Sequence, residues 1–343
     1  MEKSGVQETE FKEARWYKKL ENQTVQCQLC NRECKIAPNK TGICRVRKNI
    51  DGTLYALTYG RTLTMSIDPV EKKPLFHFKP GTLCTGVSTF GCNFRCTFCQ
   101  NWQISQDFME SQIAAVPYTF PEEIVLQTKT QGIPGIAYTY TEPTIFAEYA
   151  LDTMKLAKEQ GLYNVWISNG YTTQNALKDI IPYMDAVNVD LKGNEKFYRK
   201  MCGNIDRKKI IQNIEYYFKK GVHLEVTNLV VPGSNDSDND FREISEFISS
   251  LNPDIPLHFS RFFPHWKMQD TPPTPISSLA RARKIAEEAG LNYVYIGNVS
   301  GEENTHCKKC KTLLVKRFLY QTSMPALEGN NCKKCGTKNN FIP

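Results

Sequence analysis

The stretch TGVSTFGCNFRCTFCQNW, residues 85–102, joins a short β-branched run to a compact cysteine loop. The first residues of this stretch predict a strand, and Cys92, Cys96 and Cys99 follow after Gly91, which lets the backbone turn sharply. Most cubane iron–sulfur clusters use four cysteines, one for each iron, so three thiolates leave one iron open to a non-protein ligand. The loop therefore predicts such a cluster. A structural zinc site completed by a distant ligand is the alternative.

Outward from this loop, the chain alternates β-branched or aromatic runs with longer amphipathic stretches. Predicted strands cover residues 85–90, 135–141, 163–168, 186–192, 223–231, 256–262 and 292–299. Predicted helices lie near 121–131, 144–160, 173–181, 208–220, 238–251 and 276–289. This alternation predicts an α/β fold with a parallel sheet, and six or more such units curl most readily into a full or partial barrel.

Unusual residues follow the predicted strands in succession, each at a carboxyl end. They are Gly91-Cys92, Thr141-Glu142, Asn169-Gly170, Asp190 with Lys192, Pro232-Gly233 and His258. In parallel α/β folds these strand ends meet at one edge, where functional groups gather. The sequence therefore predicts one site at that edge.

Two further cysteine sets lie outside this region. The N-terminal set is Cys27, Cys30, Cys34 and Cys44, and the C-terminal set is Cys307, Cys310, Cys332 and Cys335. No secretory signal is recognisable, so a reducing cytosol is expected, where such spacing indicates metal binding rather than disulfides. The C-terminal set predicts zinc in a ribbon-like module, with rubredoxin-like iron or an auxiliary cluster as alternatives. The N-terminal set predicts a tetrathiolate zinc or iron site, or an auxiliary [4Fe–4S] cluster.

Two cysteines belong to no set. Cys84 precedes a strand and is expected in the core. Cys202 is expected either as an inert buried thiol or, if it lines the site, as a hydrogen-atom donor or substrate contact. Lys72, Lys73 and His77 are candidates to cover the substrate side.

Composition and charge bound the remaining possibilities. The formal net charge is +7, but the thiolates of three metal sites would remove most of this excess, so no nucleic-acid partner is expected. No apolar run approaches the roughly 20 residues needed to cross a bilayer, so we expect a soluble cytoplasmic protein without a membrane partner. We expect three regions: 1–83, 84–300 and 301–343. The first contains a predicted strand pair, LYALTYG followed by RTLTMSID.

The cysteine loop resembles the signature of the radical S-adenosylmethionine (SAM) superfamily, with Phe98 as the aromatic residue before the last cysteine. The rest is similar to the branch that includes pyruvate formate-lyase activating enzyme, with Thr139-Tyr140-Thr141-Glu142 where that branch has Gly-Gly-Glu. The segments FGCNFRCTFCQNW, DPVEKKPLFHFKPG, YTYTEPT and YIGNV resemble more closely the radical SAM enzyme of the AmmeMemoRadiSam system.

This resemblance implies a partial (β/α)6-type barrel that holds a [4Fe–4S] cluster on Cys92, Cys96 and Cys99. SAM would chelate the open iron and be cleaved reductively to methionine and a 5′-deoxyadenosyl radical, which takes a hydrogen atom from substrate. The resemblance also implies an electron donor of the ferredoxin or flavodoxin type.

The resemblance assigns roles to individual residues, each with a structural alternative. Phe98 would pack near adenine or only in the core. Glu142, with Thr141 beside it, would bind the methionyl ammonium or only open a helix. Asn169 would reach the ribose or carboxylate, or form a plain turn. Lys192 would pair with the SAM carboxylate beside Asp190, unless the two form a simple ion pair. His258 would meet the ribose or be structural.

The substrate is open between hypotheses of different classes. One is radical chemistry on a small molecule or protein, with Memo-like and AMMECR-like proteins as partners. A second is the activation of a glycyl radical enzyme. A third, without catalysis, is a zinc-stabilised binding module.

Overall fold

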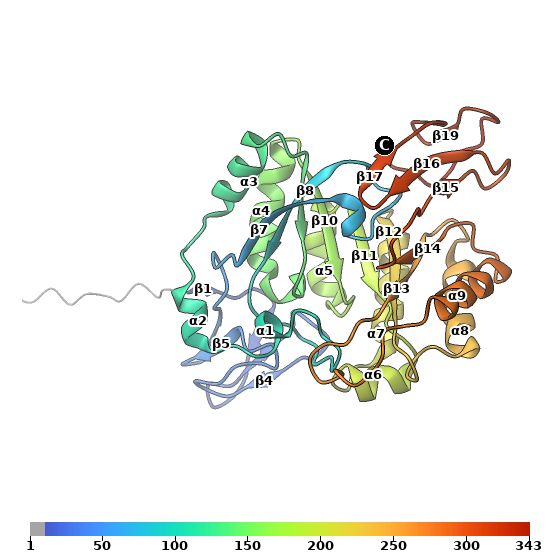
Figure 1. Ribbon diagram of the computed structural model, residues 1–343. Helices are drawn as coiled ribbons and strands as arrows, with labels where there is room; N and C mark the ends of the chain where they lie inside the picture. The colour runs from blue at the N-terminus through green and yellow to red at the C-terminus, as the bar shows by residue number, and fades with distance from the viewer. Residues whose placement is uncertain (1–10) are drawn as a thin grey trace, which may run out of the picture.

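An eight-stranded sheet forms the centre of the structure, a computed structural model that describes residues 11–343 (Figure 1). The first ten residues of the predicted region 1–83 lie outside the described residues. The strand order is β14-β13-β12-β11-β10-β9-β8-β7, and β8 to β14 run parallel in chain order. These strands are β8 (Leu83–Ser88), β9 (Gly135–Tyr138), β10 (Tyr163–Ser168), β11 (Ala186–Asp190), β12 (His223–Val230), β13 (Leu257–Arg261) and β14 (Val294–Gly297). The predicted parallel α/β sheet is confirmed.

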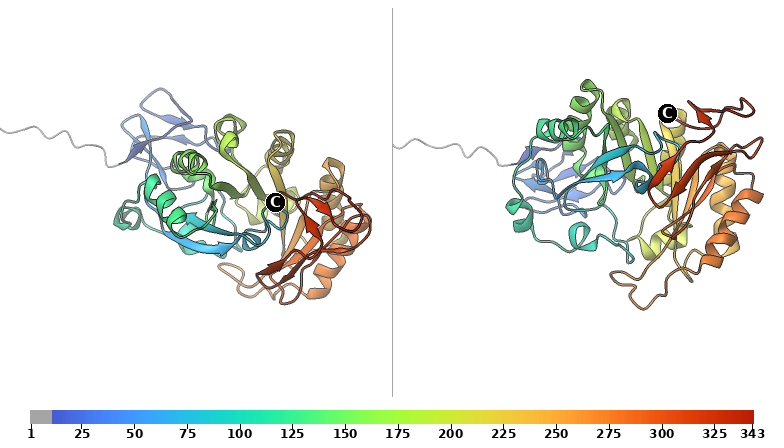
Figure 2. Two further views of the ribbon diagram at one scale, coloured as in Figure 1. Left: turned by 90° about the horizontal axis from the view of Figure 1, so that it is seen from above. Right: turned by 45° about the horizontal axis from the view of Figure 1, so that its top comes forward.

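Helices connect the parallel strands and lie around the outside of the sheet (Figure 2). The main ones are α3 (Pro121–Thr130), α4 (Ala147–Glu159), α5 (Gln174–Ile180), α7 (Arg207–Lys219), α8 (Asp238–Leu251) and α9 (Ile276–Glu288). The crossovers are right-handed, and the strand order advances in one direction. All of these helices therefore lie on one face of the sheet, and the other face is left free for a site. Within residues 11–343 no helix is both long and apolar enough to span a membrane.

Shorter helices, which the alternation did not predict, interrupt the connections. They are α1 (Trp102–Ser105), α2 (Glu110–Ala115), α6 (Glu195–Met201) and the 3-10 helices η1 (Val70–Lys72), η2 (Pro143–Phe146) and η3 (Ile181–Tyr183). Of these, α6 begins where the Asn194 side chain accepts a hydrogen bond from the amide of Phe197 across 2.9 Å, as an N-cap does.

The predicted strand pair in the N-terminal region is wrong. β7 (Thr64–Pro69) does not pair with β6 (Thr53–Ala56) but runs antiparallel to β8 and ends the central sheet. β6 instead pairs with β5 (Arg47–Ile50) through a tight turn at Asp51-Gly52. Asp-Gly is a preferred two-residue hairpin turn, and this local preference determines the pairing.

The N-terminal region consists of two small sheets beside the carboxyl ends of the central strands. One has the order β1-β6-β5, with β1 (Lys12–Glu13), and the other contains β2 (Tyr17–Lys19), β3 (Val25–Cys27) and β4 (Lys35–Ile36). Its contacts with the central sheet are specific: Cys30 forms a β-bridge with Thr172, and Asn31 donates to the carbonyls of Tyr171 and Thr172.

The C-terminal region packs at the end of the sheet opposite the N-terminal region (Figure 1). It contains β15 (Thr305–His306), β16 (Leu313–Phe318), β17 (Gln321–Ser323), β18 (Leu327–Glu328) and β19 (Asn331–Cys332). It has a small core of its own and is attached through Ile342, whose carbonyl accepts from the amide of Lys79 across 2.6 Å. The ring of Phe341 stacks on His77 at 4.2 Å between centroids.

Candidate functional site

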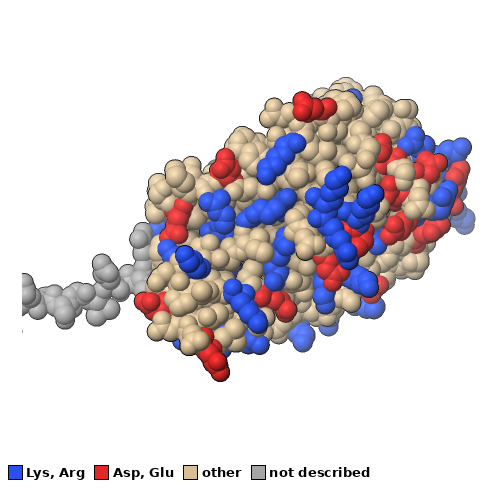
Figure 3. All heavy atoms as spheres, turned by 90° about the horizontal axis from the view of Figure 1, so that it is seen from below, with Lys and Arg blue, Asp and Glu red and all other residues tan. Residues whose placement is uncertain are grey.

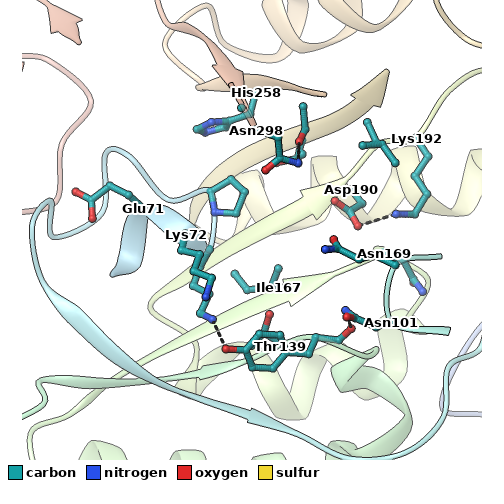
Figure 4. A pocket seen from close by; sticks show the side chains of 18 of the residues that line it. Glu71, Lys72, Asn101, Thr139, Ile167, Asn169, Asp190, Lys192, His258 and Asn298 are labelled. Atoms are coloured by element: carbon teal, nitrogen blue, oxygen red, sulfur yellow. Dashed lines mark hydrogen bonds and ion pairs between the residues drawn. The ribbon is translucent and has the colours of Figure 1, made fainter. Parts of the chain in front are cut away.

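A cavity of about 870 Å³ lies at the carboxyl ends of the parallel strands (Figure 4). The residues predicted to hold the cluster or SAM line it: Cys92, Cys96, Cys99, Phe98, Thr141, Glu142, Asn169, Asp190, Lys192 and His258. Gly91, Gly170, Pro232 and Gly233, which were also predicted at this edge, do not. The chain after β8 supplies the cysteines and Phe98, and β9, β10, β11 and β13 or the residues just after them supply the others in order. These side chains therefore lie at one edge of the sheet, and the role predicted for each of them stays a prediction.

The cysteine loop is held so that its three thiols line the cavity. The amide of Phe94 donates to Sγ of Cys92 across 3.4 Å, and Sγ of Cys99 lies 3.2 Å from the hydroxyl of Ser105. Burial raises the pKa of the Cys92 thiol, so a bound cation is needed to keep it as a thiolate. Three thiols on one side of a cavity suit a cluster with one open position.

Glu142 lies buried beside the loop, with most of its carboxylate occupied. Its Oε1 accepts from the hydroxyls of Thr144 (2.5 Å) and Ser168 (2.8 Å), while Oε2 accepts from the amide of Asn169 across 2.8 Å. Burial raises the pKa of Glu142, and these donors oppose that shift. Only Oε2 keeps room for a further donor from the cavity.

Asn169 connects the strand ends to the cysteine loop. Its Nδ2 donates to Oδ1 of Asn93 across 2.7 Å and lies 3.9 Å from Sγ of Cys92. Its Oδ1 accepts from the amide of Tyr171, as in an Asx turn. Asn169 therefore forms a turn and contacts the cysteine loop at the same time.

Asp190 and Lys192 form an ion pair of 2.7 Å on the same side of β11 and its extension. Burial would lower the pKa of Lys192, but the negative charges of Asp190 and of the Cys96 thiolate raise it, so the ammonium stays charged. The ammonium also lies 5.9 Å from the ring centroid of Phe98. A fixed cation thus lies between the cysteine loop and the cavity.

His258 is part of a buried network that the sequence analysis did not predict. Its Nε2 lies 2.7 Å from Oε2 of Glu225, and His223 contacts the other oxygen at 3.1 Å. Burial would raise the pKa of Glu225, but hydrogen bonds from His223 and His258 hold it well below its usual range. An ionised carboxylate only accepts, so Nε2 of His258 is protonated and donates in this hydrogen bond. The signal was available, since His223, Glu225 and Thr227 alternate along one face of β12.

The opposite wall comes from the segment before β8 and from the end of β9. Lys73 is buried and donates to Asp68 across 2.7 Å and to the hydroxyl of Tyr140 across 3.1 Å. Burial would raise the pKa of Asp68, but hydrogen bonds from Lys72, Lys73 and Tyr140 hold it low. Tyr140 itself has a positive φ of 67°. Lys72 and Lys73 line the cavity as predicted, but His77 does not.

The C-terminal region completes the wall, which the sequence analysis also missed. Arg317, Leu319 and Tyr320 line the cavity. The Arg317 guanidinium is buried and donates to the carbonyl of Phe76 across 2.5 Å, so β16 is fixed to the segment that carries Lys72 and Lys73.

A family model described as the radical SAM superfamily matches residues 87–248, which contain the cysteine loop and most of the cavity. This stretch is a radical SAM domain. An uncharacterized protein of Methanocaldococcus jannaschii is 45% identical over 97% of this chain and 100% of its own length. The radical SAM domain, with activating enzymes among the relatives, supports a radical SAM enzyme, a class that generally needs a reductant. It favours an enzyme over the zinc-stabilised binding module.

Other relatives of this radical SAM enzyme are more distant. The pyruvate formate-lyase-activating enzyme of Streptococcus mutans is 24% identical over 47% of this chain and 64% of its own. The solved structure of Streptococcus suis SuiB bound to its precursor peptide SuiA has a TM-score of 0.51 and 13% identity. That alignment covers 67% of this chain and 51% of SuiB, and at this identity it shows the fold alone.

Cys84 and Cys202 of this radical SAM enzyme do not line the cavity. Cys84 is fully buried in the core, as predicted. Cys202 is also fully buried and does not line the cavity, but it lies beside Cys96, and a hydrogen bond between the two thiols raises the pKa of Cys96. The predicted burial of the Cys202 thiol is therefore confirmed.

The C-terminal cysteine set has the geometry of a site for one metal ion. Its four Sγ atoms lie within 4.8 Å of one another, and within residues 11–343 no other group of three or more Cys, His, Asp or Glu does so. Two pairs, Cys307 with Cys335 and Cys310 with Cys332, are separated by 3.7 Å and 3.6 Å. A tetrahedral ion with metal–sulfur distances of about 2.3 Å separates its thiolates by about 3.8 Å. Hydrogen bonds with Thr312 lower the pKa of Cys310 to about 6, which favours a thiolate.

Proposed function

We propose that the cavity binds SAM beside a [4Fe–4S] cluster held by Cys92, Cys96 and Cys99. When bound, these cofactors supply the reductive cleavage of SAM to methionine and a 5′-deoxyadenosyl radical, which takes a hydrogen atom from substrate. One observation carries the proposal: of all cysteines in the described chain, these three alone line the cavity. The protein thus offers three thiolates and leaves the fourth position open toward the space where SAM would lie.

The side chains around the cavity are proposed to orient SAM. Lys192 would meet its carboxylate, since its charge is held by Asp190, and Oε2 of Glu142 would accept from its ammonium. Asn169 would contact the ribose or carboxylate, with Asp190 and Thr141 as further polar contacts. Phe98 would lie against adenine. His258 would contact a ribose hydroxyl through Nδ1, because its other nitrogen is bonded to Glu225.

The finer architecture is part of this proposal. The sheet would curl as a partial (β/α)6-type barrel around the cavity, and the C-terminal set would hold zinc in a ribbon-like module. The measured Sγ separations support a single ion of this size. A ferredoxin- or flavodoxin-type protein in the cytoplasm would supply the electron.

For the substrate, we propose the AmmeMemoRadiSam system, with Memo-like and AMMECR-like proteins as partners. The motifs around the cysteine loop and in residues 68–81 support this choice. A second candidate is the activation of a glycyl radical enzyme. It is favoured by a 24% identical relative from Methanocaldococcus jannaschii, which is itself described as a putative glycyl-radical enzyme activating enzyme.

Formation of 5′-deoxyadenosine tests the proposed chemistry. Protein reconstituted anaerobically with iron and sulfide is given SAM and dithionite, beside a variant with Cys92, Cys96 and Cys99 changed to Ala. Cys84→Ala is the matched control, because Cys84 is buried but lies off the cavity. We expect product from the wild type and the control and none from the triple variant. Product from all three proteins, or a wild type that takes up zinc instead of iron, would contradict the proposal.

A further inference from the structure

The N-terminal cysteine set differs in geometry from the C-terminal one. Its members are near one another: the amide of Cys27 donates to the carbonyl of Cys34 across 3.0 Å, and a Cβ on Gly42, two residues before Cys44, would lie 3.6 Å from Sγ of Cys34. Nevertheless, no three of its Sγ atoms lie within 4.8 Å of one another, as a single ion would require. The three cysteines of the cavity share this property. A cubane binds each thiolate to a different iron and so holds them farther apart than one ion does.

The same set lies directly against the cysteine loop of the cavity. A Cβ on Gly91 would lie 2.9 Å from the carbonyl oxygen of Cys44, so the two segments are in backbone contact. Arg32, between Cys30 and Cys34 in the chain, donates from Nε to the carbonyl of Asn93 across 2.9 Å. The first contact joins Cys44 to Gly91, and the second joins Arg32 to Asn93. Gly91 and Asn93 are the residues on either side of Cys92.

Arg95 bridges the two cysteine sets from within the loop. Its Nη1 donates to the carbonyl of Cys92 across 2.9 Å, and its Nη2 donates to the carbonyl of Ile43, the residue before Cys44. Burial lowers the pKa of Arg95, while the charges of Cys92 and Cys44 together oppose that shift. One guanidinium thus connects the backbones beside one cysteine of each set.

We propose that Cys27, Cys30, Cys34 and Cys44 hold a second iron–sulfur cluster that passes electrons to the cluster on Cys92, Cys96 and Cys99. The second half of this statement rests on the proposed function. A low-potential one-electron reductant reduces the N-terminal cluster, which is reoxidised as it gives the same electron to the cluster of the cavity. No bond forms or breaks at either cluster. The entry side is Cys34, which is partly exposed, whereas the other three cysteines of its set are buried.

The surface near this entry carries several cations. Lys35, Lys40 and Arg45 belong to the N-terminal region. Figure 3, a view from below, shows Lys and Arg spread across that face, with Asp and Glu also among them and densest on the right. A basic face favours the approach of an acidic electron-transfer protein.

The first test is the metal content of the Cys92→Ala, Cys96→Ala, Cys99→Ala triple variant after anaerobic reconstitution. We expect about eight irons and eight sulfides in the wild type, and about four of each in the variant, with an electron paramagnetic resonance signal of a reduced cubane after dithionite. Cys84→Ala should match the wild type. A variant that holds a second zinc ion in addition to the one expected at the C-terminal set, or a single iron without sulfide, would overturn the second cluster. This measurement does not depend on SAM cleavage, so the second cluster can be disproved while the proposed function stands.

The second test addresses electron transfer with Arg95→Met, which removes the bridge but no cysteine. We expect the variant to keep the metal content of the wild type while the cluster of the cavity, followed by rapid-freeze resonance spectroscopy, is reduced by ferredoxin at least tenfold more slowly. Arg242→Met, on α8, is the control. An unchanged rate in Arg95→Met would refute the relay, and equal iron loss in both cysteine sets would show that Arg95 is only structural.

Discussion

Nε2 of His258 donates to Oε2 of Glu225 across 2.7 Å at the floor of the cavity. The amides of Phe76 and His77 donate to the same carboxylate, across 3.0 and 2.7 Å, and His223 contacts it from the other side. A single buried charge therefore joins β12, β13 and the segment that forms the opposite wall.

We expect Glu225→Gln to lower the free energy of unfolding by about 3–5 kcal/mol, because an amide places a donor where four donors already converge. Urea unfolding of the anaerobic protein measures this. Glu288→Gln, in an exposed pair with Lys284, should change it by less than about 0.5 kcal/mol. Equal effects of the two substitutions would show that the network is not a structural centre.

Lys192→Met is expected to weaken SAM binding while the protein stays folded. A hydrogen bond to a charged group contributes about 1.5–3 kcal/mol, which corresponds to about 10- to 100-fold in Kd. Equilibrium dialysis with labelled SAM under anaerobic conditions provides the measurement. Lys219→Met, an exposed residue of α7, serves as the control. An unchanged Kd for Lys192→Met would reduce the Asp190–Lys192 pair to a structural role.

Gly91→Ala should damage the cysteine loop far more than its backbone angle explains. Gly91 has a φ of 98°, and a Cβ there would approach Cys44 and Val46 to within 2.9 and 2.8 Å. Gly132→Ala is the matched control, because Gly132 also has a positive φ of 69° but has no atom within 4 Å of the added carbon. We expect Gly91→Ala to lose bound iron and about 1–3 kcal/mol more stability than the control. Similar iron content in the two variants would contradict the close packing.

His77 makes stability depend on pH. Burial lowers the pKa of His77 to about 3, whereas an unfolded histidine titrates near 6.5. The unfolded chain therefore takes up the proton first, so this contribution is complete above about pH 6.5 and is lost toward pH 3, by up to about 1.4 kcal/mol per unit. Urea unfolding at about pH 7 and pH 5 should show a larger loss in the wild type than in His77→Gln. The same loss in both proteins would rule out His77 as the cause.

Cys310→Ser is expected to remove one zinc ion per chain and to release the C-terminal region. The four cysteines of that set join strands whose own core is small, so the metal supplies much of their stability. Metal analysis and limited proteolysis between residues 303 and 341 measure both effects. Cys84→Ser should retain the zinc. Full zinc content in Cys310→Ser would show that the metal, if any, binds elsewhere.

The sequence predicted the elements whose pattern is local. Seven strands and six connecting helices followed from periodicity and from turn residues such as Gly132 and Gly161, and the cavity followed from polar residues at strand ends. The strand β7 was predicted, but its partner was not. β6 pairs locally with β5 through the Asp51-Gly52 turn, whereas β7 pairs with β8 at the edge of the central sheet.

The missed parts of the site come from distant contacts. Arg317 reaches Phe76 across 241 positions of the chain, and no local pattern indicates such a contact. Glu225 is the only acidic residue of β12, and its alternation with His223 and Thr227 is the one local sign of the network. Tyr140 has a backbone angle that its residue type does not predict.

The cavity wall formed by Arg317, Leu319 and Tyr320 has a consequence for biogenesis. During synthesis the cysteine loop leaves the ribosome more than 200 positions before these residues, so this wall of the cavity is missing while the rest of the chain is made. Iron delivery to the loop is sterically easiest in that interval. Once β16 has packed against Phe76, the same wall shields the site from oxidants, so the order of translation itself separates assembly of the site from its protection.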